Sequence, residues 1–135
     1  MTKGHSVQHV GRKAQAFGMK VQYFNRTQLK EEEETSLNVR YVSFQDLLKG
    51  SDVVCINCPL TDETRGMIGE AEISSMKDGV FLVNTGRGPI VDEKALIKAL
   101  WAGKIERAGL DVFDDEPNIK YVFEATRFLP LLTLK

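Results

Sequence analysis

Two short apolar runs in the second half of the chain end abruptly in polar loops. Gly79–Val83 leads into Asn84-Thr-Gly-Arg-Gly, and Ala108–Val112 leads into an acidic turn that ends in Glu116-Pro117. Short apolar runs bounded by glycine, asparagine and proline are typical of buried strands. Open α/β folds bind their ligands at the carboxyl ends of such strands. We therefore expect Arg87 and Glu116 to lie at that edge of a sheet.

The rest of the chain alternates between expected strands and helices, which is typical of a mainly parallel α/β sheet. Strands are expected at residues 19–24, 52–56, 79–83 and 108–112. Helices are expected at 7–17, at 43–50 from a Ser43–Asp46 capping box, in two short pieces within 61–76, and at 92–103 behind an Asp92 cap. The four glutamates of Lys30–Thr35 predict a solvated loop. No internal repeat or linker divides residues 1–135.

The composition is that of one ordinary globular domain and excludes some partners. The 135 residues are 42% hydrophobic and 27% charged, with a net charge of -1. Such a balance indicates neither a nucleic-acid partner nor an anionic membrane surface. Without a signal peptide or an apolar run of spanning length, a cytoplasmic location is expected.

The two cysteines, Cys55 and Cys58, form a C-x-x-C pair. A metal or redox role needs a second ligand pair or a thioredoxin-like context, and the sequence has neither. Cys55 lies within the apolar run 53–56, where a buried thiol behaves as a small hydrophobic side chain. We therefore expect structural cysteines and no metal site.

Arg87 and Glu116 are the strongest candidates for chemistry. Glycines flank Arg87 and permit close approach of a ligand, and a guanidinium fork suits a carboxylate or a phosphate. Glu116 precedes Pro117, which stiffens its loop, and such a carboxylate can orient a base or raise its pKa. The plainer alternatives are that Arg87 is an ordinary surface arginine in a turn, and that Glu116 belongs to a solvated acidic turn.

Other polar residues follow the expected strands at the same edge. Asp111 can accept a hydrogen bond from a ligand, and Cys58-Pro59 makes a sharp exit from the strand at 52–56. Asn25-Arg26 follows the strand at 19–24, where a dinucleotide fold places an acidic residue for a ribose 2′-hydroxyl or an arginine for a 2′-phosphate. Arg26, with no carboxylate beside it, favours the phosphate, although it is also explained as an ordinary surface residue.

Several motifs in one order and spacing closely resemble the nucleotide-binding domain of D-isomer-specific 2-hydroxyacid dehydrogenases, most like the glyoxylate/hydroxypyruvate reductase branch. The resemblance covers roughly residues 4–135 and is specific as a set. It is carried by Phe17-Gly-Met-Lys-Val, Cys58-Pro-Leu-Thr-Asp-Glu-Thr, Met76-Lys-Asp-Gly, Leu82-Val-Asn-Thr-Gly-Arg-Gly, Val91-Asp-Glu-Lys-Ala-Leu and Gly109-Leu-Asp-Val-Phe-Asp-Asp-Glu-Pro.

The resemblance implies a Rossmann-like doubly wound parallel sheet and reduction of a 2-keto acid with hydride from a nicotinamide cofactor. Arg87 resembles the arginine that binds the substrate carboxylate and polarises its carbonyl, and Glu116 resembles the glutamate that pairs with the catalytic histidine. Cofactor-binding positions are then Gly4, Asn25, Arg26, Cys58, Pro59, Thr85 and Asp111, with NADP expected and NAD possible. The family also suggests a possible homodimer.

Two departures from the family pattern bear on activity. Only Gly4 survives of a G-x-G-x-x-G that falls at residues 2, 4 and 7, and the central strand before it is missing, so we expect two sheet halves with unpaired edges. The last strand, the Pro-His motif and the substrate domain are expected to be missing as well. Residues 1–135 are thus a partial dinucleotide-binding domain, expected to bind NADPH weakly and to show no turnover alone. The alternatives are a non-catalytic nucleotide-binding or regulatory module and a non-functional remnant.

Overall fold

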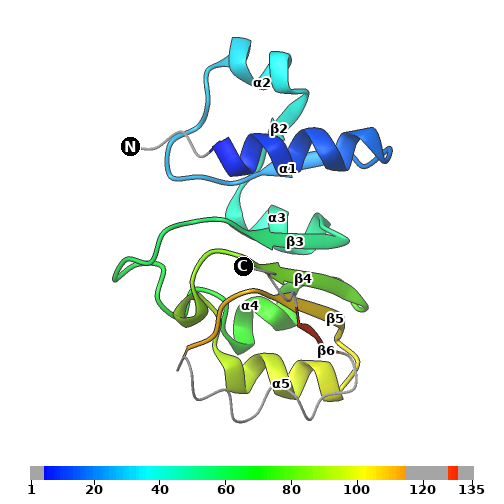
Figure 1. Cartoon of the computed structure of the whole chain (residues 1–135), viewed down its shortest axis with the longest axis vertical. Coiled ribbons are helices and arrows are strands. Elements are labelled where there is room, and N and C mark those ends of the chain that lie inside the picture. The colour runs from blue at the N-terminus through cyan, green and yellow to red at the C-terminus, as the bar shows by residue number, and fades with distance from the viewer. Residues whose placement is uncertain (1–4, 115–127, 131–135) are drawn as a thin grey trace. The chain divides into compact units, whose positions relative to one another are not determined.

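The computed structural model describes residues 5–114 and 128–130, and the chain forms two compact units, Met1–Leu47 and Leu48–Lys135. Each unit contains its own parallel sheet (Figure 1). Parallel strands joined by helices confirm the predicted α/β class. The division into a two-stranded and a four-stranded sheet agrees with the expected two sheet halves.

The first unit pairs two short parallel strands, β1 (Val21–Tyr23) and β2 (Val39–Tyr41). The helix α1 (His5–Ala16) precedes β1, and Gly18 follows its end with a φ of 79° and a hydrogen bond from its N–H to Gln15 O at 2.8 Å. The Gln15 side chain donates to the carbonyls of Leu37 (2.9 Å) and Asn38 (2.8 Å). These bonds fasten α1 to the segment that leads into β2.

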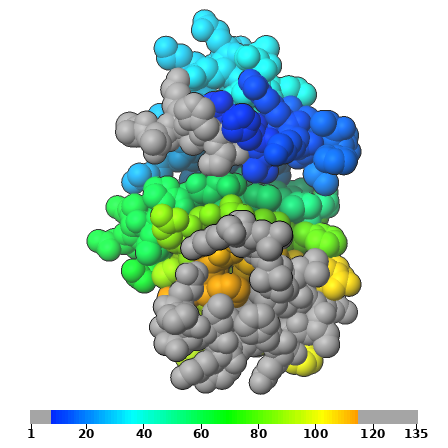
Figure 2. All heavy atoms as spheres, in the orientation of Figure 1, coloured from blue at the N-terminus to red at the C-terminus, as the bar shows by residue number. Residues whose placement is uncertain are grey.

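The helix α2 (Glu31–Leu37) corrects the prediction of a loop at Lys30–Thr35. The run of glutamates fills the first turn of α2, where negative charge interacts favourably with the helix dipole. The Glu33 carboxylate accepts a hydrogen bond from the Lys30 N–H at 3.4 Å, and Asn38 ends the helix in the left-handed conformation. Figure 2 shows α2, coloured cyan, at the surface, so the expected exposure of the glutamates to solvent does not require a loop.

The Tyr23 hydroxyl closes the loop between β1 and α2. It donates to Glu34 Oε1 at 2.6 Å and accepts from the Leu29 N–H at 2.8 Å. The Gln28 amide donates to the same glutamate oxygen at 2.9 Å. Burial and the bond to Glu34 raise the pKa of Tyr23 to about 12. The loop thus held is the one that carries Asn25 and Arg26.

The raised pKa of Tyr23 predicts a loss of stability at high pH. Its ordinary value is 10.0, so between about pH 10 and 12 the unfolded chain releases this proton before the folded chain does. Stability contributed by the hydroxyl is complete below pH 10 and is lost as the pH rises through that window. Thermal unfolding at intervals of pH, compared with Tyr23→Phe, isolates the effect. A constant difference between the two curves from about pH 9 to 12 contradicts it.

The second unit contains a four-stranded parallel sheet in the order β3-β4-β5-β6. The strands are β3 (Val53–Ile56), β4 (Val80–Asn84), β5 (Ile105–Leu110) and β6 (Phe128–Pro130). The helix α3 (Phe44–Gly50) precedes β3, and Ser43 Oγ accepts from the Asp46 N–H at 3.1 Å as the predicted capping box requires. The helices α4 (Glu70–Ser75) and α5 (Glu93–Trp101) and the short 3-10 helix η1 (Gly88–Ile90) connect the strands. Asp92 Oδ1 caps α5 by accepting from the backbone N–H groups of Lys94 and Ala95.

One face of this sheet carries the core of the unit. Alternate strand residues are buried, and α4 and α5 bury apolar side chains as well; these residues are Val54, Ile56, Val80, Leu82, Ile105, Ala108, Leu110, Ile73, Leu96 and Leu100. The intervening strand positions point to the other face, where Val53 is 40% and Phe81 43% exposed. Cys55 is exposed on that face too, which corrects the expected buried thiol. The reason is that successive strand residues point to opposite faces, and Cys55 shares its face with Val53 and not with the buried Val54 and Ile56.

Two strands differ from the sequence-based expectations. β2 lies at Val39–Tyr41, where no strand was predicted. β6 pairs in parallel with β5 through Ala108↔Phe128 and Leu110↔Pro130, whereas the last strand was expected to be missing. In both cases three residues complete a sheet through backbone pairing, for which sequence periodicity gives almost no signal. Within residues 5–114 and 128–130, no helix is long and apolar enough to cross a membrane.

Candidate functional site

The candidate site lies in the second unit, at the carboxyl ends of three neighbouring parallel strands. Cys58 and Pro59 follow β3, Thr85 and Arg87 follow β4, and Asp111 follows β5. Because β3, β4 and β5 are adjacent and parallel, their carboxyl ends share one edge of the sheet. This is the arrangement that the sequence predicted for these five residues.

The turn after β4 is folded around the side chain of Asn84, which is 1% exposed. Its Oδ1 accepts from the Gly86 N–H at 3.0 Å, and its Nδ2 donates to Arg87 O at 3.0 Å. Thr85 and Arg87 are exposed, and the Arg87 guanidinium donates to Gly86 O at 2.7 Å. The turn therefore exposes the Arg87 guanidinium at the surface, while the buried Asn84 side chain fixes the backbone of Gly86 and Arg87 by hydrogen bonds.

The turn after β5 is fastened to the turn after β4. The Asp111 N–H donates to Asn84 O at 3.0 Å, and the Asp114 N–H donates to Glu93 Oε1 at 2.8 Å. A Cβ atom on Gly88 would overlap the backbone carbonyl of Phe113 and lie 2.5 Å from the Asp114 nitrogen. Only glycine permits this approach, so Gly88 brings the two loops into contact.

The turn after β3 also packs against the turn after β4. A Cβ atom on Gly86 would lie 3.0 Å from Cys58 O, and Thr85 Oγ1 donates to Asn57 Oδ1 at 3.4 Å. Pro59 is exposed, and its carbonyl accepts from Thr64 Oγ1 at 2.8 Å. The turn after β4, which carries Arg87, thus contacts both the turn after β3 and the turn after β5.

Desolvation by the surrounding protein raises the pKa of both cysteine thiols, although part of Cys55 is exposed. Thiols with raised pKa values stay protonated near neutral pH, and the thiolate is the reactive form. The raised pKa values therefore disfavour nucleophilic chemistry at either thiol.

Asn25 and Arg26 lie in the first unit, after β1, and both are exposed. Asn25 Oδ1 accepts from the Arg26 N–H at 3.0 Å, and Tyr41 donates to Asn25 O at 3.3 Å. No carboxylate occurs between Phe24 and Lys30. In a dinucleotide fold an arginine at this position is typical of a site for a 2′-phosphate, and an acidic residue is typical of a site for a ribose 2′-hydroxyl.

Two predicted site residues, Gly4 and Glu116, lie outside the described residues. Two further residues shape the site, Asn84 and Glu93, and neither was predicted from the sequence. Asparagine at the end of a strand, before Thr-Gly, is the available signal for Asn84, because its side chain often bonds to the backbone two residues on. The role of Glu93 depends on which loop passes α5, and the sequence gives no sign of that.

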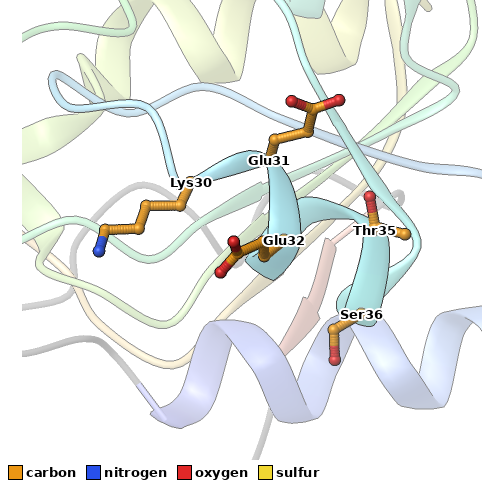
Figure 3. A pocket seen from close by; sticks show the side chains of 5 residues that line it. All are labelled: Lys30, Glu31, Glu32, Thr35 and Ser36. Carbon is orange, nitrogen blue, oxygen red and sulfur yellow. The ribbon is translucent and has the colours of Figure 1, made fainter.

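A surface hollow lies at the start of α2, and none of the predicted site residues lines it. Figure 3 shows the five residues that line it, Lys30, Glu31, Glu32, Thr35 and Ser36. All five are polar and belong to α2 or directly precede it. Ligand pockets are usually lined mainly by apolar and aromatic side chains, so this hollow is not a candidate site.

Comparisons with known proteins agree on one family. The family "D-isomer specific 2-hydroxyacid dehydrogenase, NAD binding domain" matches residues 2–129. The chain is 50% identical to the dehydrogenase efuE of Hormonema carpetanum, over 87% of this chain and 30% of that protein. It is 49% identical to the glyoxylate reductase of Thermococcus litoralis, over 84% of this chain and 34% of that protein. It thus spans about a third of the length of these curated relatives.

A solved structure supports the same grouping. The crystal structure of a glyoxylate reductase from Paecilomyes thermophila superimposes with a TM-score of 0.86 at 45% sequence identity. The match covers 93% of this chain and 38% of that chain. The two short sheets described above therefore correspond to parts of a Rossmann-like dehydrogenase fold.

Proposed function

The chain belongs to the family of D-isomer specific 2-hydroxyacid dehydrogenases, with the NAD binding domain over residues 2–129, and from this we propose its function. Residues 1–135 provide part of the nucleotide-binding domain of an oxidoreductase that reduces a 2-keto acid of the glyoxylate or hydroxypyruvate type to a D-2-hydroxy acid. Relatives named glyoxylate reductase support this substrate class.

The exposed guanidinium of Arg87, at the edge where three loops meet, is the observation that carries the proposal. A 2-keto acid offers a carboxylate, which a guanidinium binds with two parallel hydrogen bonds. Its ketone oxygen gains negative charge as the bond to hydrogen forms, and a nearby cation stabilises that charge. Arg87 therefore binds and orients the substrate and favours the transition state.

The remaining predicted residues take supporting roles in this proposal. Glu116 holds the proton of a histidine acid, and Asp111, Thr85, Cys58, Pro59 and Gly4 line the cofactor. The bound nicotinamide cofactor supplies the hydride. Asn25 and Arg26 favour the 2′-phosphate of NADP over the free ribose of NAD, since their loop contains no carboxylate. A homodimer and a cytoplasmic location complete the proposal.

The carboxylate-binding role of Arg87 is tested directly on this chain with oxalate, a dicarboxylate close in shape to glyoxylate. We expect backbone amide signals of residues 84–88 to shift saturably in NMR titrations, with an affinity in the millimolar range, about 4 kcal/mol. Arg87→Ala removes the response because it removes the only group proposed to bind the carboxylate.

Arg107→Ala is the matched control for this titration, because Arg107 is an exposed arginine within β5 of the same sheet. It should leave the oxalate response unchanged. Equal oxalate binding by the unaltered chain and by Arg87→Ala contradicts the proposed function, as does the absence of any response in the unaltered chain.

A further inference from the structure

Asn84 stands out among the described residues because its polar side chain is almost fully buried. It is 1% exposed, and the only other buried polar residue there is Ser51 at 9%. Asn84 ends β4, a strand whose other buried residues, Val80 and Leu82, are apolar. A buried amide at the end of an apolar strand costs stability unless it is fully hydrogen-bonded. The partners of its hydrogen bonds therefore indicate which part of the structure the Asn84 side chain supports.

Both ends of the Asn84 amide bond to the turn that carries Arg87. Oδ1 fixes the Gly86 N–H and Nδ2 fixes the Arg87 carbonyl, each at 3.0 Å. The backbone oxygen of the same residue accepts from the Asp111 N–H, also at 3.0 Å. One residue therefore sets the backbone on both sides of the exposed guanidinium and ties it to the loop after β5.

We propose that Asn84 is a positioning residue, whose buried amide holds residues 85–87 in the form that presents the Arg87 guanidinium to a carboxylate. This inference rests on the proposed function of Arg87. Gly86 makes the backbone of residues 85–87 intrinsically flexible. The two hydrogen bonds from the Asn84 side chain restrict that flexibility. A guanidinium held in one place loses less freedom on binding and binds more tightly.

Asn84→Asp separates the positioning of Arg87 from the stability of the fold, because the introduced carboxyl group can be protonated or ionised. Its protonated carboxylic acid donates one hydrogen bond and accepts another, as the amide does, whereas its carboxylate only accepts and is repelled by Arg87 O. Burial raises the pKa of a carboxyl at this site above the ordinary value of about 3.9. Lowering the pH therefore restores the two bonds within the same folded variant.

The experiment is an oxalate titration of the whole chain by NMR, followed at residues 84–88 between about pH 7.5 and 5. For Asn84→Asp we expect affinity about tenfold weaker than that of the unaltered chain at the upper pH. Its affinity should approach that of the unaltered chain as the pH falls. Oxalate keeps at least one negative charge throughout, and the unaltered chain supplies the reference at each pH.

Asn57→Asp is the matched control, since it adds the same charge directly after β3, on the same edge of the sheet, and its carboxylate can still accept the hydrogen bond from Thr85 Oγ1. It measures the purely electrostatic effect on oxalate, which should be smaller and should disappear only near the ordinary carboxyl pKa. If Asn84→Asp follows the unaltered chain, or matches Asn57→Asp at every pH, the positioning role is wrong while Arg87 keeps its function. If the unaltered chain ignores oxalate, the proposed function fails and this inference fails with it.

Discussion

Gly88→Ala is expected to destabilise the four-stranded unit by about 3 kcal/mol or more, since overpacking against backbone leaves no side chain free to move aside. The added methyl would overlap the carbonyl group of Phe113 and lie 2.5 Å from the Asp114 nitrogen. Relief requires the turn after β5 to move away, which also breaks the bond from the Asp111 N–H to Asn84 O. Urea unfolding followed by tryptophan fluorescence measures the loss, because Trp101 lies in this unit.

Gly69→Ala provides the comparison within the same unit. A Cβ atom there would meet its nearest neighbours, Glu72 Oε2 and Gly66 O, at 3.4 and 3.7 Å, which is ordinary contact. Gly69 is the N-cap of α4, so alanine should cost only about 1 kcal/mol through the cap preference. Equal losses for the two variants would mean that the close approach at Gly88 is not rigid.

Leu82→Ala should destabilise the same unit by about 2–5 kcal/mol, the usual cost of removing a large buried side chain from a close-packed core. Leu82 is 0% exposed in β4, which has β3 on one side and β5 on the other. Phe81 is the neighbouring residue and points to the opposite face, where it is 43% exposed. Phe81→Ala removes more atoms but should cost about 1 kcal/mol or less, because exposed side chains contribute little.

This pair tests whether the core occupies one face of the sheet only. Chemical unfolding of both variants under identical conditions gives the two free energies. A cost for Phe81→Ala as large as that for Leu82→Ala would show that the second face is covered in solution. A small cost for Leu82→Ala would contradict the assignment of the core itself.

The sequence predicted those elements that have strong local signals. Ser43 and Asp92 are cap residues placed before apolar periodic segments, and α3 and α5 start at these caps. The apolar runs at 52–56, 79–83 and 108–112 appear as β3, β4 and β5, with no end shifted by more than three residues. Local chemistry alone decides such elements.

The elements that were missed depend on tertiary contacts or on ambiguous composition. Four glutamates suit both a solvated loop and the first turn of a helix, and the fold selects α2. β2 contains three residues, and it is a strand because β1 lies beside it. Cys55 was expected to be buried because its apolar run has no polar face, but only one face of the sheet carries the core of this unit, and Cys55 points to the other face.

The sequence predicted that the candidate site residues lie at one edge of the sheet. It did not predict the hydrogen bonds and close contacts that hold the loops of the site together. The rule that ligands bind at carboxyl ends of strands places Arg87, Thr85, Asp111, Cys58 and Pro59 together from the sequence. The bonds of Asn84 and the contact at Gly88 depend on the paths of separate loops, which no local pattern encodes. The roles of Gly4 and Glu116 stay predictions, since both lie outside the described residues.

Two adjacent acidic residues at the start of α5 act on different parts of the molecule. Asp92 bonds to the backbone of α5 itself, whereas Glu93 bonds to the Asp114 N–H in the turn after β5. The first turn of α5 therefore bonds both to its own backbone and to the turn after β5. Local unfolding of that helix end would release the loop in the same cooperative step. Opening of the first turn of α5 would therefore reach the turn after β5 and, through the contact of that turn with Gly88, the neighbourhood of Arg87.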